Sequence, residues 1–455
     1  MLSLVRFGID PLSEMERTYR RLGALTEFRF DLAGVRKSRP YMLAVGSRYN
    51  QRVMSDPSTF QSIGVMMPGP RGSAQRRIGN GLLGPSGASH SHYRRLLAPP
   101  LRRAAVDQMA NKIGDIVDRE IDAWPQGAPI DLFQACKSVT LLAALETLFP
   151  AEHGGCGDEV LAAATLFDEH IEMEAAPLVR ALPLNLPGFP YHRVIRHSEK
   201  LEAALVAWTQ KEGTPARADN LMSILANCVD ESGTPAGDRA TLNHLPTLFA
   251  AAFETSQAAL TWVLFLLAQH PDAAAALLEE ISALPDDSSE RLVESKGLDA
   301  VTRESLRLLP IVPMLTRRTI RDTDLVDCDV AAGTYVVLSP FLTNRAPALY
   351  PEPARFLPER WASIEPTQFE YLAFGAGPRT CIGSWFASSF LRIAVGRIMR
   401  RFRLQVAPLA SIDRRVRLTL KPGPGGVPVT IHPQDGRFSA SPIRGNILQL
   451  VEGVG

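Results

Sequence analysis

The chain has 455 residues, 45% of them apolar and 21% charged, which is typical of a folded globular protein and excludes a disordered or fibrous one. Lys and Arg number 49 and Asp and Glu 48, so the net charge of +1 gives no electrostatic case for nucleic acid or an anionic membrane as the main partner. The five cysteines are odd in number, far apart and without zinc-ligand spacing, which favours a reducing compartment without structural disulfides.

The first residues indicate no targeting segment. Asp10, Glu14 and Glu16 come too early for a signal peptide, and the apolar run before them is too short to span a bilayer. We therefore expect a cytoplasmic protein without a transmembrane anchor.

The predicted elements are mostly helical. The opening of the chain is predicted to be rich in loops, with short alternating stretches at 28–32 and 41–45. Apolar periodicity then predicts helices over 94–124, 131–148, 160–174, 197–209, 242–269 and 272–283. After Pro310 the β-branched, turn-interrupted segment 315–340 indicates a small sheet. No change in composition separates independent domains, so we predict one domain over 1–437 and a C-terminal extension, a candidate mobile segment, over 438–455.

A glycine-studded loop carries the strongest chemical signal. Residues 374–383 read FGAGPRTCIG and precede an apolar helical run, so Cys381 lies near a helix N-terminus, where the dipole stabilises a thiolate able to bind a metal. Gly375, Gly377 and Gly383 would let a flat, bulky cofactor approach the backbone. A dinucleotide fingerprint would need a third glycine and a preceding strand, and a cysteine hydrolase would need a histidine signature. A structural cysteine leaves the neighbouring residues without an explanation.

This loop resembles the haem-binding signature of the cytochrome P450 superfamily, F-G-x-G-x-R-x-C-x-G, at every fixed position. The likeness extends over nearly the whole chain, to about His432, and is of the bacterial type. It implies a mainly α (α+β) fold, helix-rich with a small β-sheet subdomain. It also implies haem b with the Cys381 thiolate as axial ligand of the iron. The implied cofactor-binding residues of the loop are Phe374, Gly375, Arg379, Cys381 and Gly383.

Two acid–arginine segments match a structural network of the resembled family. Glu304 and Arg307 of ESLR are three residues apart on one helix, where a surface ion pair is the ordinary interpretation. The resemblance instead implies a buried charge cluster behind the haem, completed by Arg360 of FLPERW.

An acid and an alcohol interrupt an otherwise apolar helix. Residues 251–256, AAFETS, resemble the family pattern A/G-G-x-D/E-T-T/S. The resemblance implies that Glu254 and Thr255 deliver protons during dioxygen activation, whereas periodicity alone also allows a solvated stripe. Ala252 replaces the usual glycine, which leaves coupling efficiency open.

Basic residues are implied to face the haem propionates. His90 and Arg94 of HSHYRRLL match the family's H-x-x-x-R segment, with His92 and Arg95 as an alternative register. Arg317, with Arg318 as runner-up, matches the spacing of a second propionate-binding arginine, and Arg379 is the third.

The implied substrate pocket is apolar. Its predicted lining comes from four segments of the chain: Met66, Leu82, Leu248, Ala251, Phe253, Ile311, Val312, Met314 and Val427. The implied reaction inserts one atom of O2 into a small apolar molecule by hydroxylation or epoxidation. No flavin or ferredoxin-like segment is recognisable, so electrons from NAD(P)H are expected through a separate ferredoxin or flavodoxin. Peroxide-driven, isomerising, dehydrating, desaturating or coupling chemistry on the same fold, and a non-catalytic haem sensor or electron carrier, remain alternatives.

Overall fold

The computed structural model describes residues 4–29, 40–64, 66–84, 87–149, 158–212, 220–285 and 288–454. Residues 30–32, part of the first predicted alternating stretch, lie outside this range. The chain divides into two compact units: unit 1 is Met1–Gln61, Asp107–Val139 and Ser256–Gly455, and unit 2 is Ser62–Val106 and Thr140–Thr255. The assignment of one domain over 1–437 stays a prediction.

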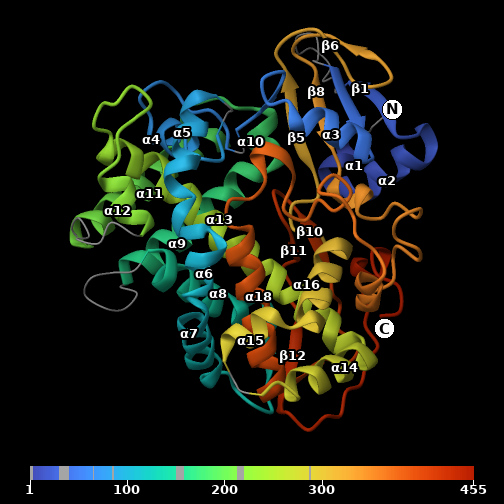
Figure 1. Cartoon of the computed structure of the whole chain (residues 1–455). Coiled ribbons are helices and arrows are strands. Elements are labelled where there is room, and N and C mark those ends of the chain that lie inside the picture. Colours follow the sequence, from blue (N-terminus) through green and yellow to red (C-terminus); the bar gives the residue numbers. More distant parts are fainter. Residues whose placement is uncertain are drawn as a thin grey trace. The chain divides into compact units, whose positions relative to one another are not determined.

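Unit 1 combines helices with short strands (Figure 1). Its helices are α1 (Leu4–Ile9), α2 (Pro11–Leu22), α3 (Ser47–Ser55), α7 (Ala110–Asp122), α14 (Pro271–Ser282), α15 (Ser289–Glu294), α16 (Lys296–Leu308), α17 (Pro340–Thr343) and α18 (Ser384–Arg401), with 3-10 turns η2 (Pro358–Ala362), η3 (Gly377–Arg379) and η4 (Asn446–Gln449). Its strands are β1 (Leu25–Arg29), β2 (Pro40–Ala44), β3 (Phe60–Ser62, whose last residue falls in unit 2), β4 (Pro129–Asp131), β5 (Leu315–Thr319), β6 (Thr323–Asp324), β7 (Asp329–Val330), β8 (Tyr335–Leu338), β9 (Phe402–Val406), β10 (Arg414–Val416), β11 (Leu420–Pro422) and β12 (Pro428–Pro433).

The sheet predicted for segment 315–340 is present, and it also includes strands from outside that segment. The strand order is β1-β2-β8-β5-β3, with β2 and β8 parallel, so strands from the first 62 residues extend it on both sides. Cross-strand aromatic pairs fix this register, because Tyr41 stacks on Phe28 at 5.4 Å and on Tyr335 at 4.9 Å between ring centroids.

The prediction that the opening of the chain is rich in loops was wrong, because α1, α2 and α3 lie there. Asp10 caps α2 through a hydrogen bond from the Ser13 N–H, Pro11 occupies the first helical position, and Gly23 ends the helix at φ +89°. These are local start and stop signals, and they were present in the sequence.

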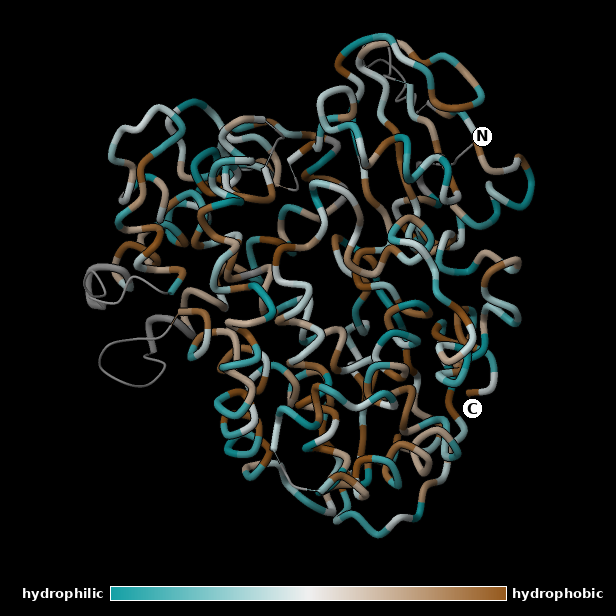
Figure 2. The backbone as a smooth tube through the Cα atoms, in the orientation of Figure 1, coloured by the Kyte–Doolittle hydropathy of each residue, from teal (hydrophilic) through white to brown (hydrophobic). Residues whose placement is uncertain are grey.

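The helical part of unit 1 encloses an apolar interior. Helix α18 contacts α7, α15 and α16, and Figure 2 shows hydrophobic segments inside this region and hydrophilic turns outside. Ile393, Ala394 and Val395 of α18 are fully buried, which accounts for the long apolar run after the cysteine loop.

The segment from residue 438 contacts the rest of unit 1. The Leu409 N–H donates to the Pro442 carbonyl, the Glu452 N–H donates to the Ala354 carbonyl, and Ile447 is fully buried. Its status as a separate extension stays a prediction.

Unit 2 is helical in its described part. It contains α4 (Ala74–Gly79), α5 (Ala88–Leu97), η1 (Pro99–Leu101), α6 (Arg103–Asp107, which reaches into unit 1), α9 (Asp158–Ala175), α10 (Pro177–Ala181), α11 (Pro190–Glu212) and α12 (Leu221–Ala226), whereas α8 (Leu132–Leu148) and α13 (Gly237–Gln269) contribute residues to both units. The single helix predicted over 94–124 was wrong, because Pro99 and Pro100 separate α5 from α6 and α7. Proline lacks the N–H that a continuing helix needs.

Helix α13 is the one described helix long and apolar enough to cross a membrane, and 82% of its most apolar window is buried inside the protein. Such a helix is typical of a protein core. Pro246 lies within it and leaves the Leu242 carbonyl without its helical donor.

Candidate active site

The cysteine loop is a closed turn before α18. The Cys381 N–H donates to the Phe374 carbonyl at 2.8 Å, and the Thr380 N–H and hydroxyl both donate to the Gly377 carbonyl. Helix α18 begins at Ser384, with Gly383 as its N-cap. Cys381 therefore lies three residues before the helix, near its N-terminus as the sequence predicted, and the residue is exposed.

Glycine is required at two positions of this loop. Gly375 and Gly377 have φ of +69° and +67°, and a Cβ on Gly377 would lie 2.4 Å from the Met54 carbonyl oxygen of α3. Apart from its chain neighbours, a Cβ on Gly383 would meet no atom of the described residues within 4 Å, so these residues leave room on that side. The loop thus has the tight backbone and the open face that a flat cofactor on the thiolate requires.

Arg317 is a buried cation without a protein counter-charge in the described residues. Its side chain is 7% exposed, its Nη1 donates to the Thr316 carbonyl at 3.0 Å, and no Asp or Glu in the described part of the chain pairs with it. Burial lowers the pKa of Arg317 to about 10, so the guanidinium remains charged at neutral pH. A buried charge needs a partner, and a haem propionate is of the right sign. The cysteine loop and Arg317, both in unit 1, therefore fit a haem.

Glu304, Arg307 and Arg360 form one buried network in unit 1. Glu304 Oε2 lies 2.9 Å from Arg307 Nε, and Oε1 lies 3.0 Å from Arg360 Nε. Arg307 also donates to the carbonyls of Asn344, Pro353 and Arg355. Glu304 and Arg307 have no exposed surface, so a surface ion pair is excluded.

Sequence reasoning missed two donors to Glu304. The Trp361 indole N–H donates to Oε2 and the Leu357 N–H donates to Oε1, both at 3.0 Å. Both residues are in the FLPERW segment that supplied Arg360, so the signal was adjacent to the motif.

The acid–alcohol segment lies on α13. The Thr255 hydroxyl donates to the Ala251 carbonyl at 2.6 Å, one turn back, and Thr255 is partly exposed. Glu254 is 7% exposed, so a fully solvated stripe does not describe it. Thr255 belongs to unit 2, as do His90 and Arg94, which are one turn apart on α5 and both partly exposed.

The predicted pocket residues are largely buried. In unit 2, Met66, Leu82 and Leu248 are each 7% exposed, and Phe253 packs on Phe249 with ring centroids 5.2 Å apart. The remaining residue of that unit, Ala251, is partly exposed, whereas unit 1 contributes Ile311, Val312, Met314 and Val427. Their contact with substrate stays a prediction.

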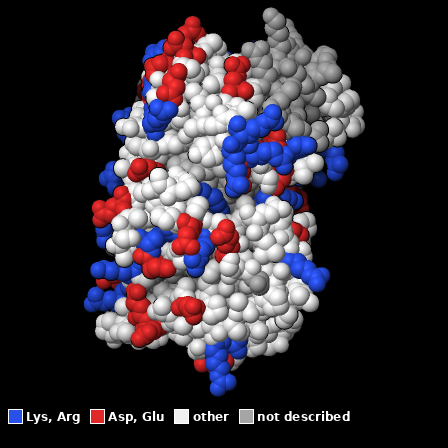
Figure 3. Space-filling model, turned by 90° about the vertical axis from the view of Figure 1, so that its right-hand side faces the viewer, with Lys and Arg blue, Asp and Glu red and all other residues white. Residues whose placement is uncertain are grey.

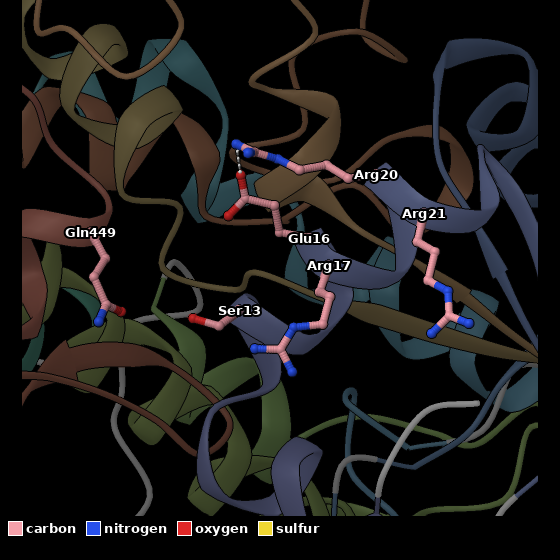
Figure 4. Close-up of a pocket in the computed structure, with 6 residues that line it drawn as sticks. All are labelled: Ser13, Glu16, Arg17, Arg20, Arg21 and Gln449. Atoms are coloured by element: carbon pink, nitrogen blue, oxygen red, sulfur yellow. Dashed lines mark hydrogen bonds and ion pairs between the residues drawn. The ribbon is translucent and has the colours of Figure 1, made fainter.

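A surface depression of about 510 Å³ in unit 1 is a different place. Its lining is Ser13, Glu16, Arg17, Arg20, Arg21 and Gln449, and it includes no predicted site residue. Figure 4 shows Arg20 directed at Glu16, with which it forms an ion pair, and Arg17 pairs with Glu14. On the face in Figure 3, basic and acidic side chains are interspersed, in keeping with the balanced net charge.

Comparison with known proteins identifies the class of protein. Residues 36–429 match the family model described as Cytochrome P450. Because this match covers most of the sequence, the chain belongs to the cytochrome P450 family.

Relatives and solved structures agree with this assignment. The chain is 28% identical to cyclooctatin synthase of Streptomyces melanosporofaciens over 85% of each chain, and 27% identical to pentalenene oxygenase of Streptomyces avermitilis over 81% of this chain and 85% of the relative. A retinoic acid-bound cyanobacterial CYP120A1 structure matches with a TM-score of 0.78 at 21% identity, covering 94% of this chain and 96% of that one. CYP175A1 of Thermus thermophilus matches with a TM-score of 0.70 at 24% identity, covering 94% and 97%.

The helix-rich P450 fold with small sheets, predicted from the sequence, is thereby confirmed. Family membership makes the protein a P450 monooxygenase, an oxidoreductase that uses haem iron bound by a cysteine thiolate, and O2. It also implies, in general, an apolar substrate and a redox partner.

Proposed function

We propose that this protein holds haem b through the Cys381 thiolate and inserts one oxygen atom from O2 into a small apolar molecule by hydroxylation or epoxidation. The observation that carries the proposal is the cysteine loop, in which Gly375 and Gly377 adopt left-handed φ and Gly377 lies against Met54. The haem would supply thiolate-assisted cleavage of the O–O bond. Phe374 would cover the sulfur side of the cofactor.

Basic side chains would hold the haem carboxylates. Arg317 carries a buried charge with no acidic partner in the described chain, and we propose that it binds a propionate together with His90, Arg94 and Arg379. Glu304, Arg307 and Arg360 would keep the fold behind the cofactor rigid.

Protons would pass along α13. Thr255 donates its hydroxyl proton to the Ala251 carbonyl, and its oxygen would accept a proton from solvent and relay a proton toward the site, with Glu254 as the acidic neighbour. The presence of both residues favours O2-dependent chemistry over peroxide-driven, isomerising or dehydrating reactions.

The substrate proposal rests on the apolar lining and on one relative's name. Pentalenene oxygenase is named for oxygenation of a hydrocarbon. We propose that the substrate of this protein is a comparable apolar molecule. Electrons would come from NAD(P)H through a separate ferredoxin or flavodoxin, and the protein would act in the cytoplasm.

The first test is the carbon-monoxide difference spectrum of the reduced, purified protein, followed by a small-molecule screen for spin-state shifts. A thiolate-type band that disappears in Cys381→Ser would support the proposal. A folded protein that takes up no haem when haem is in excess would overturn it.

The proton-delivery role has a matched control on the same helix. Thr255→Ala should leave haem and substrate binding unchanged but lower product formation by about 10²-fold, with reducing equivalents released as peroxide. Thr261 also donates its hydroxyl one turn back, to the Gln257 carbonyl at 2.8 Å, so Thr261→Ala should leave the product-to-peroxide ratio unchanged. Equal ratios in wild type and Thr255→Ala would remove this role.

A further inference from the structure

Side chains from three elements of unit 2 hold the short segment 66–68. The Met67 N–H donates to Glu174 Oε2 at 3.1 Å, and the Gln75 amide donates to the Met67 carbonyl at 2.9 Å and to Glu174 Oε1. The Tyr191 hydroxyl donates to the Pro68 carbonyl at 2.7 Å. Both polar backbone groups of Met67 are therefore bound by side chains, although no strand or helix includes this segment.

The acceptor at the centre of this arrangement is a buried carboxylate. Glu174, near the end of α9, and Gln75, on α4, have no exposed surface, and Tyr191 is 4% exposed. His170, equally buried, also faces this carboxylate, and its Nε2 lies 3.3 Å from Oε1. No group of three or more His, Cys, Asp or Glu in the described chain could hold a metal ion there. A buried carboxylate is costly unless it is hydrogen-bonded. Most hydrogen bonds that the Glu174 carboxylate accepts come from segment 66–68 and from α4, which follows it.

The same stretch of chain also lies against α13. Gly81 is packed so closely that a Cβ would lie 2.3 Å from both the Asn243 carbonyl oxygen and the Thr247 hydroxyl, and a Cβ on Gly79 would lie 3.7 Å from that of Met66. Thr247 precedes Ala251 by one turn, and the Ala251 carbonyl accepts the Thr255 hydroxyl. Residues 66–82 thus connect Glu174 to the part of α13 that precedes the acid–alcohol pair.

We propose that Glu174 is a positioning residue for substrate recognition. By holding Met67 and Gln75 it fixes Met66 and Leu82, and so limits the size of the apolar molecule that the site accepts. The proposal rests on the proposed function in one respect, the assignment of Met66 and Leu82 to the substrate pocket. Once the segment is released, only a fraction of the molecules would hold the binding-competent arrangement, and the apparent affinity would fall by that fraction.

Two variants release the segment in different ways. Glu174→Gln keeps the side-chain volume but places an amide donor toward the Gln75 amide or the Met67 N–H, both of which are donors themselves. Tyr191→Phe removes the hydrogen bond to Pro68 and keeps the ring. Tyr350→Phe is the matched control, because Tyr350 is a buried tyrosine of unit 1 that donates to the Glu370 carbonyl.

The measurements are made on the haem-loaded protein. Amide hydrogen exchange over peptides spanning 66–79 reports whether the segment is held, and spin-state titrations with the smallest and the largest ligand from the screen report recognition. In Glu174→Gln and Tyr191→Phe we expect faster exchange in 66–79 and an apparent Kd for the largest ligand raised about 10-fold, with the smallest ligand changed less than about twofold. Tyr350→Phe should change neither quantity.

The outcomes separate this proposal from the proposed function. If amide exchange in 66–79 is unchanged in both variants, these side chains do not hold the segment and the proposal is overturned. If exchange is faster but the Kd changes equally for both ligands, the role of Glu174 in substrate recognition is overturned. If Glu174→Gln fails to fold, Tyr191→Phe decides alone. A wild-type protein whose spin state no ligand shifts overturns the proposed function and this proposal with it, whereas wild-type shifts that persist unchanged in the variants overturn this proposal only.

Discussion

Two buried arginines of unit 1, Arg307 and Arg317, differ in what surrounds their charge. Arg307 pairs with both oxygens of Glu304 and donates to three backbone carbonyls. Arg317 donates to one carbonyl and has no carboxylate partner among the described residues. Burying a charge is costly unless it is paired. The charge of Arg307 is paired within the protein. Arg317 has no counter-charge among the described residues, which is the arrangement expected where an anionic ligand binds.

The Glu304 network offers the largest effect for testing this contrast. Glu304→Gln keeps the shape of the side chain but leaves Arg307 and Arg360 buried without a negative charge. We expect the free energy of unfolding of unit 1 to fall by about 3–5 kcal/mol, seen as a lower midpoint in thermal and urea unfolding of the haem-free protein.

The control for this variant is an exposed pair with the same spacing. Glu352 and Arg355 are three residues apart and both about half exposed, so Glu352→Gln should leave the midpoint unchanged. Equal shifts in the two variants would show that the buried network is not what stabilises this region.

Arg317→Gln should not lower the free energy of unfolding of the haem-free protein, in contrast to Glu304→Gln. Removing an uncompensated buried charge leaves stability unchanged or raises it, whereas haem transfer to an acceptor protein becomes about 10-fold faster or more, since a hydrogen bond to a charged group contributes about 1.5–3 kcal/mol. Unfolding midpoints and haem-transfer rates measure the two effects.

Arg318 is the control for Arg317. It follows in β5 and is exposed, so its side chain points to the opposite face of the sheet, and Arg318→Gln should change neither quantity. A destabilised haem-free Arg317→Gln protein that retains haem normally would mean that the charge of Arg317 has a partner within the protein.

Contacts between residues of local motifs could be predicted from the sequence, whereas contacts between distant segments could not. The motifs placed Glu304, Arg307 and Arg360 because their spacing is local or fixed by neighbouring motifs, and Trp361 could have been added from the letter after Arg360. Asp10 pairs with Arg414, 404 residues away, and no local pattern indicates such a contact. The joining of β2 to β8 is equally non-local, and it depends on the register of strands far apart in the chain.

The Asp10–Arg414 pair lies between the two extremes and should show the smallest effect. Arg414 is buried and its two terminal nitrogens lie 2.9 and 2.8 Å from the Asp10 oxygens, whereas Asp10 is partly exposed. Desolvation raises the pKa of Asp10, but hydrogen bonds from Arg414 and Ser13 and the Arg414 charge lower it further, to about 2. Since the folded-state pKa lies below the unfolded value, the stabilisation is present above about pH 4 and is lost as the pH falls toward 2.

Asp10→Asn should therefore lower the free energy of unfolding by only about 1 kcal/mol at neutral pH, because solvent screens a partly exposed carboxylate. The difference between wild type and variant in thermal midpoint should shrink as the pH falls from 7 to about 3, where the wild-type carboxylate begins to protonate. Asp435, an exposed partner of Arg403, is the control, and Asp435→Asn should give a smaller difference at every pH. A wild-type-to-Asp10→Asn difference that stays constant across this range would mean that the charge of Asp10 does not stabilise the fold, because the interactions with Arg414 and Ser13 that lower its pKa weaken when the carboxylate protonates.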